Sequence, residues 1–136
     1  MGWRDWNQYQ DGIDQATMEE TFRMMASRKR SVNGKPTSLI DLGYTDAGLD
    51  DGWQQCGKFG PQNWTYHSAD GSPVVDKSRF PNLKSMTDLG HSLDLTMGWY
   101  GNNCGCKDHC SSAICFAADV EATLEYGFDS IKLDGW

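Results

Sequence analysis

The chain has 136 residues, with 12 basic and 19 acidic side chains and a formal net charge of −7. This length suits one ordinary domain with a buried core and is too short for two. The acidic balance argues against nucleic acid as a partner, and no apolar run is long enough to cross a membrane. The first residues do not resemble a signal peptide, so we interpret the chain as a mature segment or a fragment.

The first part of the sequence predicts one helix and one strand separated by an insertion. The pattern Thr17-x-x-Glu20 is typical of a capping box, and apolar residues follow it at helical spacing, so we expect a helix over about 17–29. The polar stretch 30–38 is interpreted as an insertion. A short strand is expected over 44–49.

The second part continues the alternation of helices and strands. Within a long loop, residues 64–66 and 73–75 favour a small hairpin. A helix near 82–92 and a strand over 95–100 come next, and the last strand is expected over 130–134. A third helix precedes this last strand, and its predicted buried face carries Ala117, Val120, Leu124 and Phe128.

Counted from Gly2-Trp3, the elements run β-α-β-α-β-α-β, which indicates parallel strands with right-handed crossovers. This order fits either a complete, doubly wound sheet or the first half, about four β/α units, of a (β/α)8 TIM barrel. The first strand has no glycine-rich phosphate loop after it, which disfavours a dinucleotide-binding sheet. Polar and aromatic residues gather where strands end, as in a barrel's active site: Trp6, Asp50, Asp51, Tyr100 and Asp134. We therefore predict an α/β fold, the first half of a barrel.

Lys132 and Asp134 are two residues apart on one predicted strand, so their side chains point to the same face. An ammonium group beside a carboxylate keeps that carboxylate ionised, as a carboxylate nucleophile must be. An ordinary salt bridge at a strand end would have the same spacing. On spacing alone the two interpretations are equal.

Further residues at the strand ends point to carbohydrate. Asp50 and Asp51 can accept charge-assisted hydrogen bonds from neighbouring hydroxyl groups, although paired acids in a turn are commonly just solvated. Trp6 and Tyr100 offer flat apolar faces to the C–H side of a sugar ring, with Trp99 expected to face the helices. No histidine stands near a serine or cysteine nucleophile, and we expect neither a cofactor nor a metal at this site.

The cysteines allow two interpretations. In a secreted chain, five cysteines indicate disulfides with one thiol left over. In a cytosolic chain, the cysteines clustered around His109 would suggest a metal-stabilised domain, although their spacing matches the usual zinc sites poorly. A glycosylation sequon at Asn63 slightly favours the secretory route. The other two histidines, His67 and His91, are interpreted as surface or structural residues. The cysteines are Cys56, Cys104, Cys106, Cys110 and Cys115.

Five short motifs occur in order along the chain: Met1-Gly2-Trp3-x-x-Trp6, Leu49-Asp50-Asp51-Gly52-Trp53, Ser78-Arg79-Phe80-Pro81, Gly98-Trp99-Tyr100 and Ile131-Lys132-Leu133-Asp134. Their order and spacing resemble the N-terminal half of the α-galactosidases (melibiases) of glycoside hydrolase family 27. The resemblance covers residues 1–136 and implies a partial catalytic domain that holds strands one to four of the barrel.

The resemblance implies hydrolysis of terminal non-reducing α-D-galactosyl residues by a retaining double displacement. Asp134 would be the catalytic nucleophile. Lys132, Asp50 and Asp51 would hydrogen-bond galactose hydroxyls, Trp6 would pack against the sugar, and Tyr100 would lie beside the anomeric centre. The family's acid/base is a later aspartate that this chain does not contain, so the chain alone is expected to be inactive and to self-associate through its open sheet edges.

Two positions depart from the family pattern, because Gly52 and Trp136 stand where the family usually has cysteines. The resemblance thus implies that one loop cysteine lacks its usual partner. It also implies a secretory route, whether extracellular, vacuolar or lysosomal. The alternatives are an α-N-acetylgalactosaminidase and a catalytically silent galactose-binding module.

Overall fold

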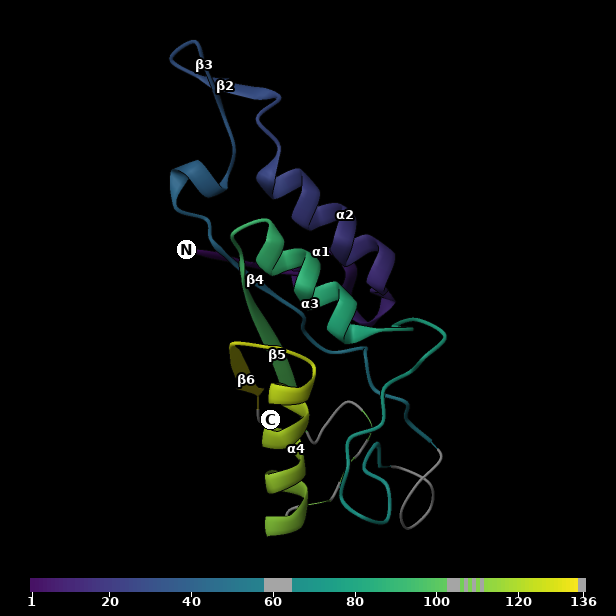
Figure 1. Ribbon diagram of the computed structural model, residues 1–136. Helices are drawn as coiled ribbons and strands as arrows, with labels where there is room; N and C mark the ends of the chain where they lie inside the picture. Colours follow the sequence, from purple (N-terminus) through teal and green to yellow (C-terminus); the bar gives the residue numbers. More distant parts are fainter. Residues whose placement is uncertain (58–64, 103–105, 107, 109, 111, 135–136) are drawn as a thin grey trace.

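The computed structural model describes residues 1–57, 65–102, 106, 108, 110 and 112–134. Its strands and helices follow one another along the chain as Figure 1 shows. The strands are β1 (Gly2–Arg4), β2 (Arg30–Val32), β3 (Lys35–Thr37), β4 (Asp46–Gly48), β5 (Thr96–Asn102) and β6 (Ser130–Asp134). The α-helices are α1 (Trp6–Tyr9), α2 (Gln15–Ala26), α3 (Leu83–Ser92) and α4 (Ala113–Glu125), and the short 3₁₀ turns are η1 (Gln10–Gly12) and η2 (Ile40–Leu42).

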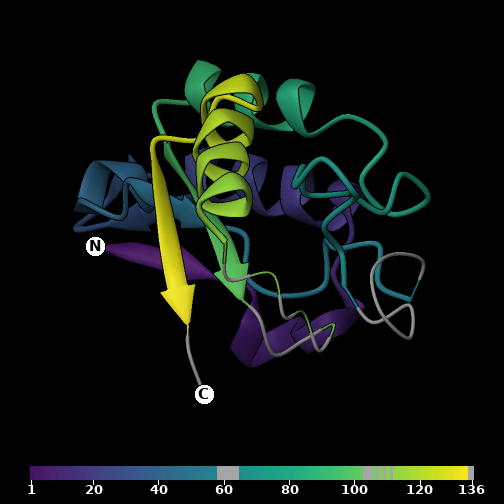
Figure 2. The ribbon, with the colours of Figure 1, turned by 90° about the horizontal axis from the view of Figure 1, so that it is seen from below.

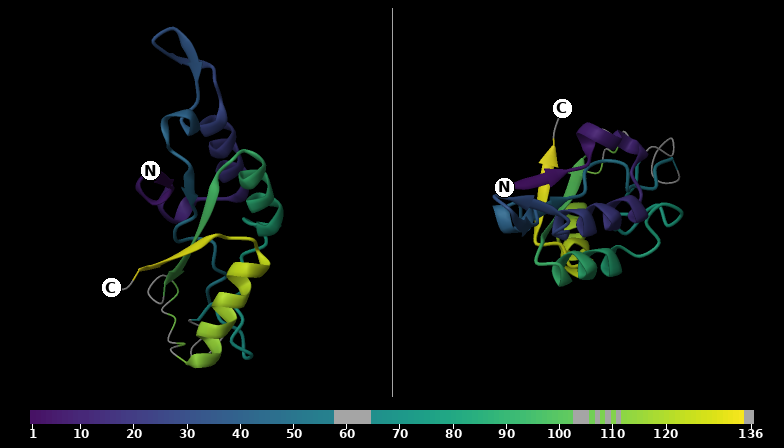
Figure 3. Two further views of the ribbon diagram at one scale, coloured as in Figure 1. Left: turned by 60° about the vertical axis from the view of Figure 1, so that its left-hand side comes forward. Right: turned by 90° about the horizontal axis from the view of Figure 1, so that it is seen from above.

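Four strands form one parallel sheet in the order β1-β4-β5-β6, which is also their order along the chain. The helices α2, α3 and α4 all lie on the same side of this sheet, as the views along it show (Figures 2 and 3). A doubly wound sheet would carry crossover helices on both faces, whereas a barrel keeps them all outside. The architecture is therefore that of a partial (β/α)8 barrel, as the sequence predicted.

Helix α2 begins earlier and ends earlier than predicted. Asp14 caps it, since its side chain accepts a hydrogen bond of 2.8 Å from the backbone N–H of Thr17. The chain then leaves the helix at Ser27, which has an extended backbone. The predicted capping box at Thr17 was wrong, because an aspartate three residues upstream satisfies the free N–H groups first.

The polar stretch 30–38 contains structure that the sequence analysis missed. Strands β2 and β3 form an antiparallel hairpin, which projects away from the rest of the fold (Figure 1). Its turn residues Asn33 and Gly34 both have positive φ angles, 52° and 77°. An Asn-Gly pair is the usual sequence of such a two-residue turn, so the signal was present in the sequence.

The remaining strands and the second helix agree with the predictions within a few residues. Helix α3 is the helix predicted near 82–92, and β4, β5 and β6 are the predicted strands. The hairpin predicted within the long loop is short: the backbone N–H of Val74 donates a 2.8 Å hydrogen bond to the carbonyl oxygen of Tyr66, next to an antiparallel bridge between His67 and Pro73. Its residue Trp64 lies outside the described part of the chain.

The predicted buried face of the third helix was wrong. In α4, Val120 and Leu124 are 60% and 71% exposed, and the residues that it buries are Cys115 and Ala122. Phe128 follows the helix and is buried, with its ring stacked on Trp99 at 5.3 Å between centroids. The apolar stripe faces solvent because no described element packs over it.

None of the described helices combines the length and the apolar character that a membrane span requires.

Aromatic rings fill the core between the sheet and the helices. Trp99 of β5 is 1% exposed, and its ring lies 4.6 Å from that of Trp53 and 5.7 Å from that of Tyr126. The Trp53 indole also donates a hydrogen bond of 3.0 Å to the carbonyl oxygen of Tyr100. Trp99 therefore faces the helices, as predicted, and its neighbour Tyr100 has the opposite orientation on the strand.

The inner face of the sheet carries a row of small residues crossed by one arginine. Arg4, Gly48, Gly98 and Ser130 are paired across β1, β4, β5 and β6. A Cβ atom on Gly48 would lie 2.6 Å from Arg4 Cζ, and one on Gly98 would lie 2.8 Å from Arg4 Nη2. The Arg4 guanidinium also donates a 3.1 Å hydrogen bond to the carbonyl oxygen of Leu49. The glycines thus leave room for the arginine to lie across the sheet.

The substitution Gly48→Ala should lower the free energy of unfolding by about 1–3 kcal/mol, because the added methyl group overlaps the fixed Arg4 side chain. Gly12→Ala is the matched control, since a Cβ there meets nothing within 4 Å, and its effect should stay within about 0.5 kcal/mol. Urea unfolding followed by circular dichroism measures both. Equal stabilities of the two variants would contradict this account of Arg4.

Candidate active site

The carboxyl-terminal ends of β4, β5 and β6 bring together four residues that the sequence analysis selected. Lys132 Nζ lies 3.0 Å from Asp50 Oδ2 and 3.2 Å from Asp134 Oδ2. The Tyr100 hydroxyl donates a 3.4 Å hydrogen bond to Asp134 Oδ2. The ammonium group also lies 5.0 Å from the centroid of the Tyr100 ring. One lysine thus bridges two carboxylates beside an aromatic ring.

Strand register explains why these side chains meet. Tyr100 is paired with Lys132 across β5 and β6, and paired residues point to the same face of a sheet. Asp50 stands two residues after Gly48, and Asp134 stands two residues after Lys132. The site therefore forms the next layer above the Arg4 row, on the inner face and toward the strand ends. This is where barrels build their active sites.

Burial and charge differ among the members of the site. The Asp50 side chain is 3% exposed, that of Lys132 is 34% exposed and that of Asp134 is 51% exposed. Burial alone would lower the pKa of Lys132, but the hydrogen bonds and charges of Asp50 and Asp134 raise it above its ordinary value. Lys132 is therefore a cation at neutral pH. Asp50 anchors it from the buried side, and Asp134 presents its carboxylate to solvent.

Asp51 and Trp6 lie near these strand ends without joining the ion-paired group. The Asp51 carboxylate accepts a 2.9 Å hydrogen bond from the backbone N–H of Gly52, and burial raises the pKa of this carboxyl group. Trp6 opens α1, two residues after the end of β1, and is 42% exposed. Among the described residues, the structure gives neither of them a direct contact with Lys132. Their roles remain predictions.

Asp5 is a member of this region that the sequence analysis missed. It is fully buried, and its Oδ1 accepts a 2.6 Å hydrogen bond from the backbone N–H of Asp50. Its Oδ2 has no hydrogen-bond partner among the described residues. Burial raises the pKa of Asp5 to about 6, although the hydrogen bond from Asp50 opposes the shift. The available signal was an acidic residue directly after the first strand.

Arg79 holds the loop that follows Asp50 and Asp51. Its guanidinium donates a 2.7 Å hydrogen bond to the carbonyl oxygen of Gly52 and further hydrogen bonds to the carbonyl oxygens of Asp11 and Ile13. One side chain therefore ties the loop after β4 to η1 and to the residue that follows η1. The Ser78-Arg79-Phe80-Pro81 motif acts here as a structural clamp beside the candidate site.

Four of the five cysteines form two disulfides, Cys56–Cys106 and Cys110–Cys115. This pairing favours the disulfide interpretation of the cysteines over a metal site in the oxidised chain. Cys104, His109, Asn63 and Trp136 lie outside the described residues. Among the histidines, His67 is buried beside the second disulfide, and His91 Nε2 lies 2.9 Å from Asp129 Oδ2 at the surface.

Comparisons with known proteins agree with the resemblance in the motifs. No model of a protein family matches the chain. The chain is 32% identical over 139 residues to a probable α-galactosidase D of Aspergillus terreus and 28% identical over 138 residues to an α-galactosidase of Coffea arabica. Each similarity covers 98% of this chain but only 18% and 32% of the relative.

Solved structures give the same result for the fold. A crystal structure described as a putative α-galactosidase from Bacteroides fragilis superposes on 99% of this chain with a TM-score of 0.76 at 26% identity, and the match covers 26% of that protein. The chain therefore resembles one part of an α-galactosidase TIM barrel, and it spans less than a third of the length of these relatives.

The substitution Asp5→Asn tests whether Asp5 is a buried carboxyl group with a raised pKa. The folded protein holds the Asp5 proton up to about pH 6, whereas the unfolded chain releases it near the ordinary pKa of 3.8. The contribution of this group to stability is therefore present at low pH and is lost as the pH rises through that window, by up to about 3 kcal/mol. Asparagine has no such dependence.

Between about pH 4 and pH 7, the free energy of unfolding of the Asp5→Asn variant should consequently rise relative to that of the parent chain. Urea unfolding at several pH values measures this difference. Asp88→Asn, a change of an exposed helical carboxylate, should instead follow the parent closely at each pH. A constant offset between Asp5→Asn and the parent would show that the Asp5 pKa is not raised.

Proposed function

We propose that residues 1–136 form the nucleophile-bearing part of the catalytic barrel of an α-galactosidase, which hydrolyses terminal non-reducing α-D-galactosyl residues. The observation that carries this proposal is the cluster of Lys132 with Asp50 and Asp134 beside Tyr100 at the strand ends. The similarity of nearly the whole chain to α-galactosidases supports the choice of galactose as the sugar. The substrate class is accordingly an α-galactoside, either an oligosaccharide or a glycoconjugate.

Asp134 is the proposed nucleophile of a retaining double displacement. Its carboxylate is half exposed and lies 3.2 Å from the Lys132 ammonium and 3.4 Å from the Tyr100 hydroxyl, at the strand ends where a bound sugar could reach it. In the first step, a carboxylate oxygen forms a bond to C1 of the sugar while the bond from C1 to the departing oxygen breaks. Water then attacks C1 and releases galactose and the free carboxylate.

The other predicted residues would bind the galactose. Lys132 and Asp50 already form one charged pair, so hydroxyl groups of the sugar can donate to the carboxylate and accept from the ammonium. Asp51 would add a second carboxylate at the end of β4. Trp6 would pack against the ring, because it is 42% exposed near the strand ends. Tyr100 is 3% exposed and would lie beside the anomeric centre, where its hydroxyl donates to Asp134.

The proton donor of the reaction is proposed to lie in the remainder of the barrel. Retention needs a second carboxyl group about 5 Å from the nucleophile. Asp50 does not suit this role, because it is buried and ion-paired with Lys132. A general acid contributes about 10²–10⁴-fold to such a reaction, so the 136-residue chain alone should be silent on unactivated galactosides.

Two properties of the chain accompany this proposal. Disulfides persist in oxidising compartments, so the two cystines support a secretory route, whether extracellular, vacuolar or lysosomal. Strands β1 and β6 are the two edges of the parallel sheet, and Leu133 on β6 is 79% exposed. Open edges of this kind favour self-association of the isolated chain.

An activated sugar tests the nucleophile without requiring the missing acid. In an α-galactosyl fluoride, the fluoride at C1 can leave without a general acid when Asp134 attacks. A second fluorine on the ring slows hydrolysis of the resulting glycosyl ester, so mass spectrometry should locate a stable ester on the Asp134 peptide. The Asp134→Asn variant should remain unlabelled, and the Asp88→Asn control should label like the parent chain. Labelling at another residue would overturn the assignment of Asp134, whereas galactose binding without any label would favour a silent galactose-binding module.

The substitution Asp51→Ala should weaken galactose binding by about 1.5–3 kcal/mol, the value of a lost charged hydrogen bond. Isothermal titration calorimetry with galactose measures this change, and Asp88→Ala serves as the control for removal of a carboxylate. Parallel titrations with N-acetylgalactosamine test the alternative that the site belongs to an α-N-acetylgalactosaminidase and prefers that sugar to galactose. Unchanged galactose affinity in Asp51→Ala would remove Asp51 from the pocket.

A further inference from the structure

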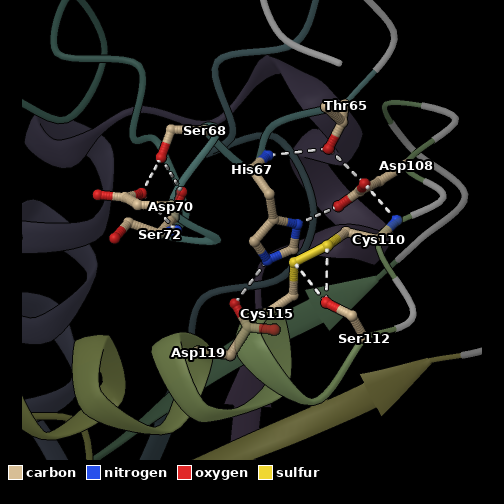
Figure 4. The surroundings of a disulfide bond; sticks show 10 residues. All are labelled: Thr65, His67, Ser68, Asp70, Ser72, Asp108, Cys110, Ser112, Cys115 and Asp119. Atoms are coloured by element: carbon tan, nitrogen blue, oxygen red, sulfur yellow. Dashed lines mark hydrogen bonds and ion pairs between the residues drawn. A yellow bond between two sulfur atoms is a disulfide. The ribbon is translucent and has the colours of Figure 1, made fainter. Parts of the chain in front are cut away.

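A second cluster of chemically active side chains surrounds the Cys110–Cys115 disulfide (Figure 4). The His67 ring is 4% exposed, and its Nε2 lies 2.9 Å from the Asp119 carboxylate on α4. The ligand atoms of His67, Cys110 and Cys115 all lie within 4.8 Å of one another. None of these residues belongs to the candidate active site, so a role for this cluster is independent of the proposed hydrolase function.

We propose that reduction of the Cys110–Cys115 disulfide converts this cluster into a binding site for a zinc-type divalent cation. The ligands would be His67 Nε2, the two cysteine sulfurs and a carboxylate oxygen of Asp119. One imidazole, two thiolates and one carboxylate make a four-coordinate set of the nitrogen, sulfur and oxygen donors that zinc prefers. The structure already gathers the His67, Cys110 and Cys115 donors, and the contact of 2.9 Å with His67 Nε2 brings the Asp119 carboxylate beside them.

The backbone arrangement supports such a site. Cys115 and Asp119 are four residues apart on α4, so both side chains lie on one face of the helix. Cys110 stands in the loop before that helix, and its Cα atom lies 6.2 Å from that of Cys115. Around zinc, with bonds of about 2.3 Å, the two sulfurs would lie roughly 3.8 Å apart. Side-chain rotation can supply this separation once the sulfur–sulfur bond is broken.

Asp108 would act as the outer partner of the metal ligand. Its carboxylate is 1% exposed and pairs with His67 Nδ1, which directs Nε2 toward the sulfurs and Asp119. The Thr65 hydroxyl and the backbone N–H of Cys110 both donate to Asp108, so its position is fixed. A carboxylate on the far nitrogen of a metal-binding histidine orients the ring and strengthens its binding.

Disulfide formation and metal binding exclude each other in this proposal. In the oxidised chain both sulfurs are consumed by the disulfide, and neither is a thiolate ligand. A phosphine reductant breaks the sulfur–sulfur bond, takes oxygen from water to become the phosphine oxide, and leaves two thiols. The bound cation then displaces both thiol protons and the proton between His67 Nε2 and Asp119, so metal binding releases protons to the solvent.

Cobalt(II) titration of the reduced chain tests the proposal, because Co²⁺ replaces zinc and reports thiolate ligands and tetrahedral geometry in its absorption spectrum. The reduced parent chain should bind one equivalent, with a thiolate-to-cobalt band, and the oxidised chain should give no such band. In the presence of Zn²⁺, Cys110 and Cys115 should resist alkylation while Cys56 and Cys106 react, as peptide mass spectrometry would record.

Variants identify the ligands. His67→Gln and Asp119→Asn should each weaken Co²⁺ binding by about tenfold or more, and a Cys110→Ser/Cys115→Ser double variant should abolish the thiolate band. His91→Gln is the matched control, since that ring pairs with Asp129 at the surface, and it should bind Co²⁺ like the parent. Asp119 is 22% exposed, so Asp119→Asn decides the matter if His67→Gln fails to fold.

The proposal would be overturned by an absent one-equivalent complex, by a thiolate band that persists in the double cysteine variant, or by unchanged affinity in Asp119→Asn. Equal binding by the oxidised chain would remove the redox control. A Cys56→Ser/Cys106→Ser variant should keep the band, and its loss in that folded variant would assign the thiolates to the other cysteine pair instead.

Discussion

The ion pair between Lys132 and Asp50 is the interaction on which the candidate site depends. It joins β6 to the end of β4 across the intervening strand β5, so it fixes the spacing of three strand ends at once. Asp50 is almost fully buried, and removal of Lys132 would leave an unpaired charge in the protein interior. The same ammonium holds Asp134 at 3.2 Å. A structural pair thereby positions the group that we assign to the chemistry.

The layer beneath this pair explains how the strand ends keep their positions. Arg4 lies over Gly48 and Gly98 and donates to the carbonyl oxygen of Leu49, next to Asp50. The Asp5 carboxylate accepts a hydrogen bond from the backbone N–H of Asp50 itself. Arg4 and Asp5, two consecutive residues at the end of β1, thus both hold the end of β4 in place. The site is built on strands that these contacts fix before any ligand is present.

Much of this arrangement could be predicted from the sequence, because the barrel rules depend on order and alternation. The spacing of Lys132 and Asp134 placed both on one face, and the alternation of Trp99 with Tyr100 assigned one to the core and one to the site. The wrong predictions arose where another residue took the expected role or where the expected packing partner was absent from the described residues. Asp14 replaced the predicted cap at Thr17, and no described element covers the apolar stripe of α4 that carries Leu124.

Contacts between distant segments account for what sequence reasoning missed. The role of Asp5 depends on a backbone N–H that lies 45 residues away, and that of Arg79 depends on three carbonyl oxygens from two loops. No local pattern encodes such partners. Likewise, His67 stood apart from the cysteines in the sequence, and only the packing of α4 brings its ring against Cys115.

The central claim is that Asp134 faces the anomeric carbon of a galactose held by Lys132 and Asp50. A crystal structure of this chain, or of a longer protein that contains it, with a bound α-galactoside tests the claim most directly. The account predicts that an Asp134 carboxylate oxygen lies about 3–3.5 Å from C1 and that Lys132 and Asp50 contact the sugar's hydroxyl groups. A galactose bound at these strand ends with Asp134 turned away from C1 would contradict it.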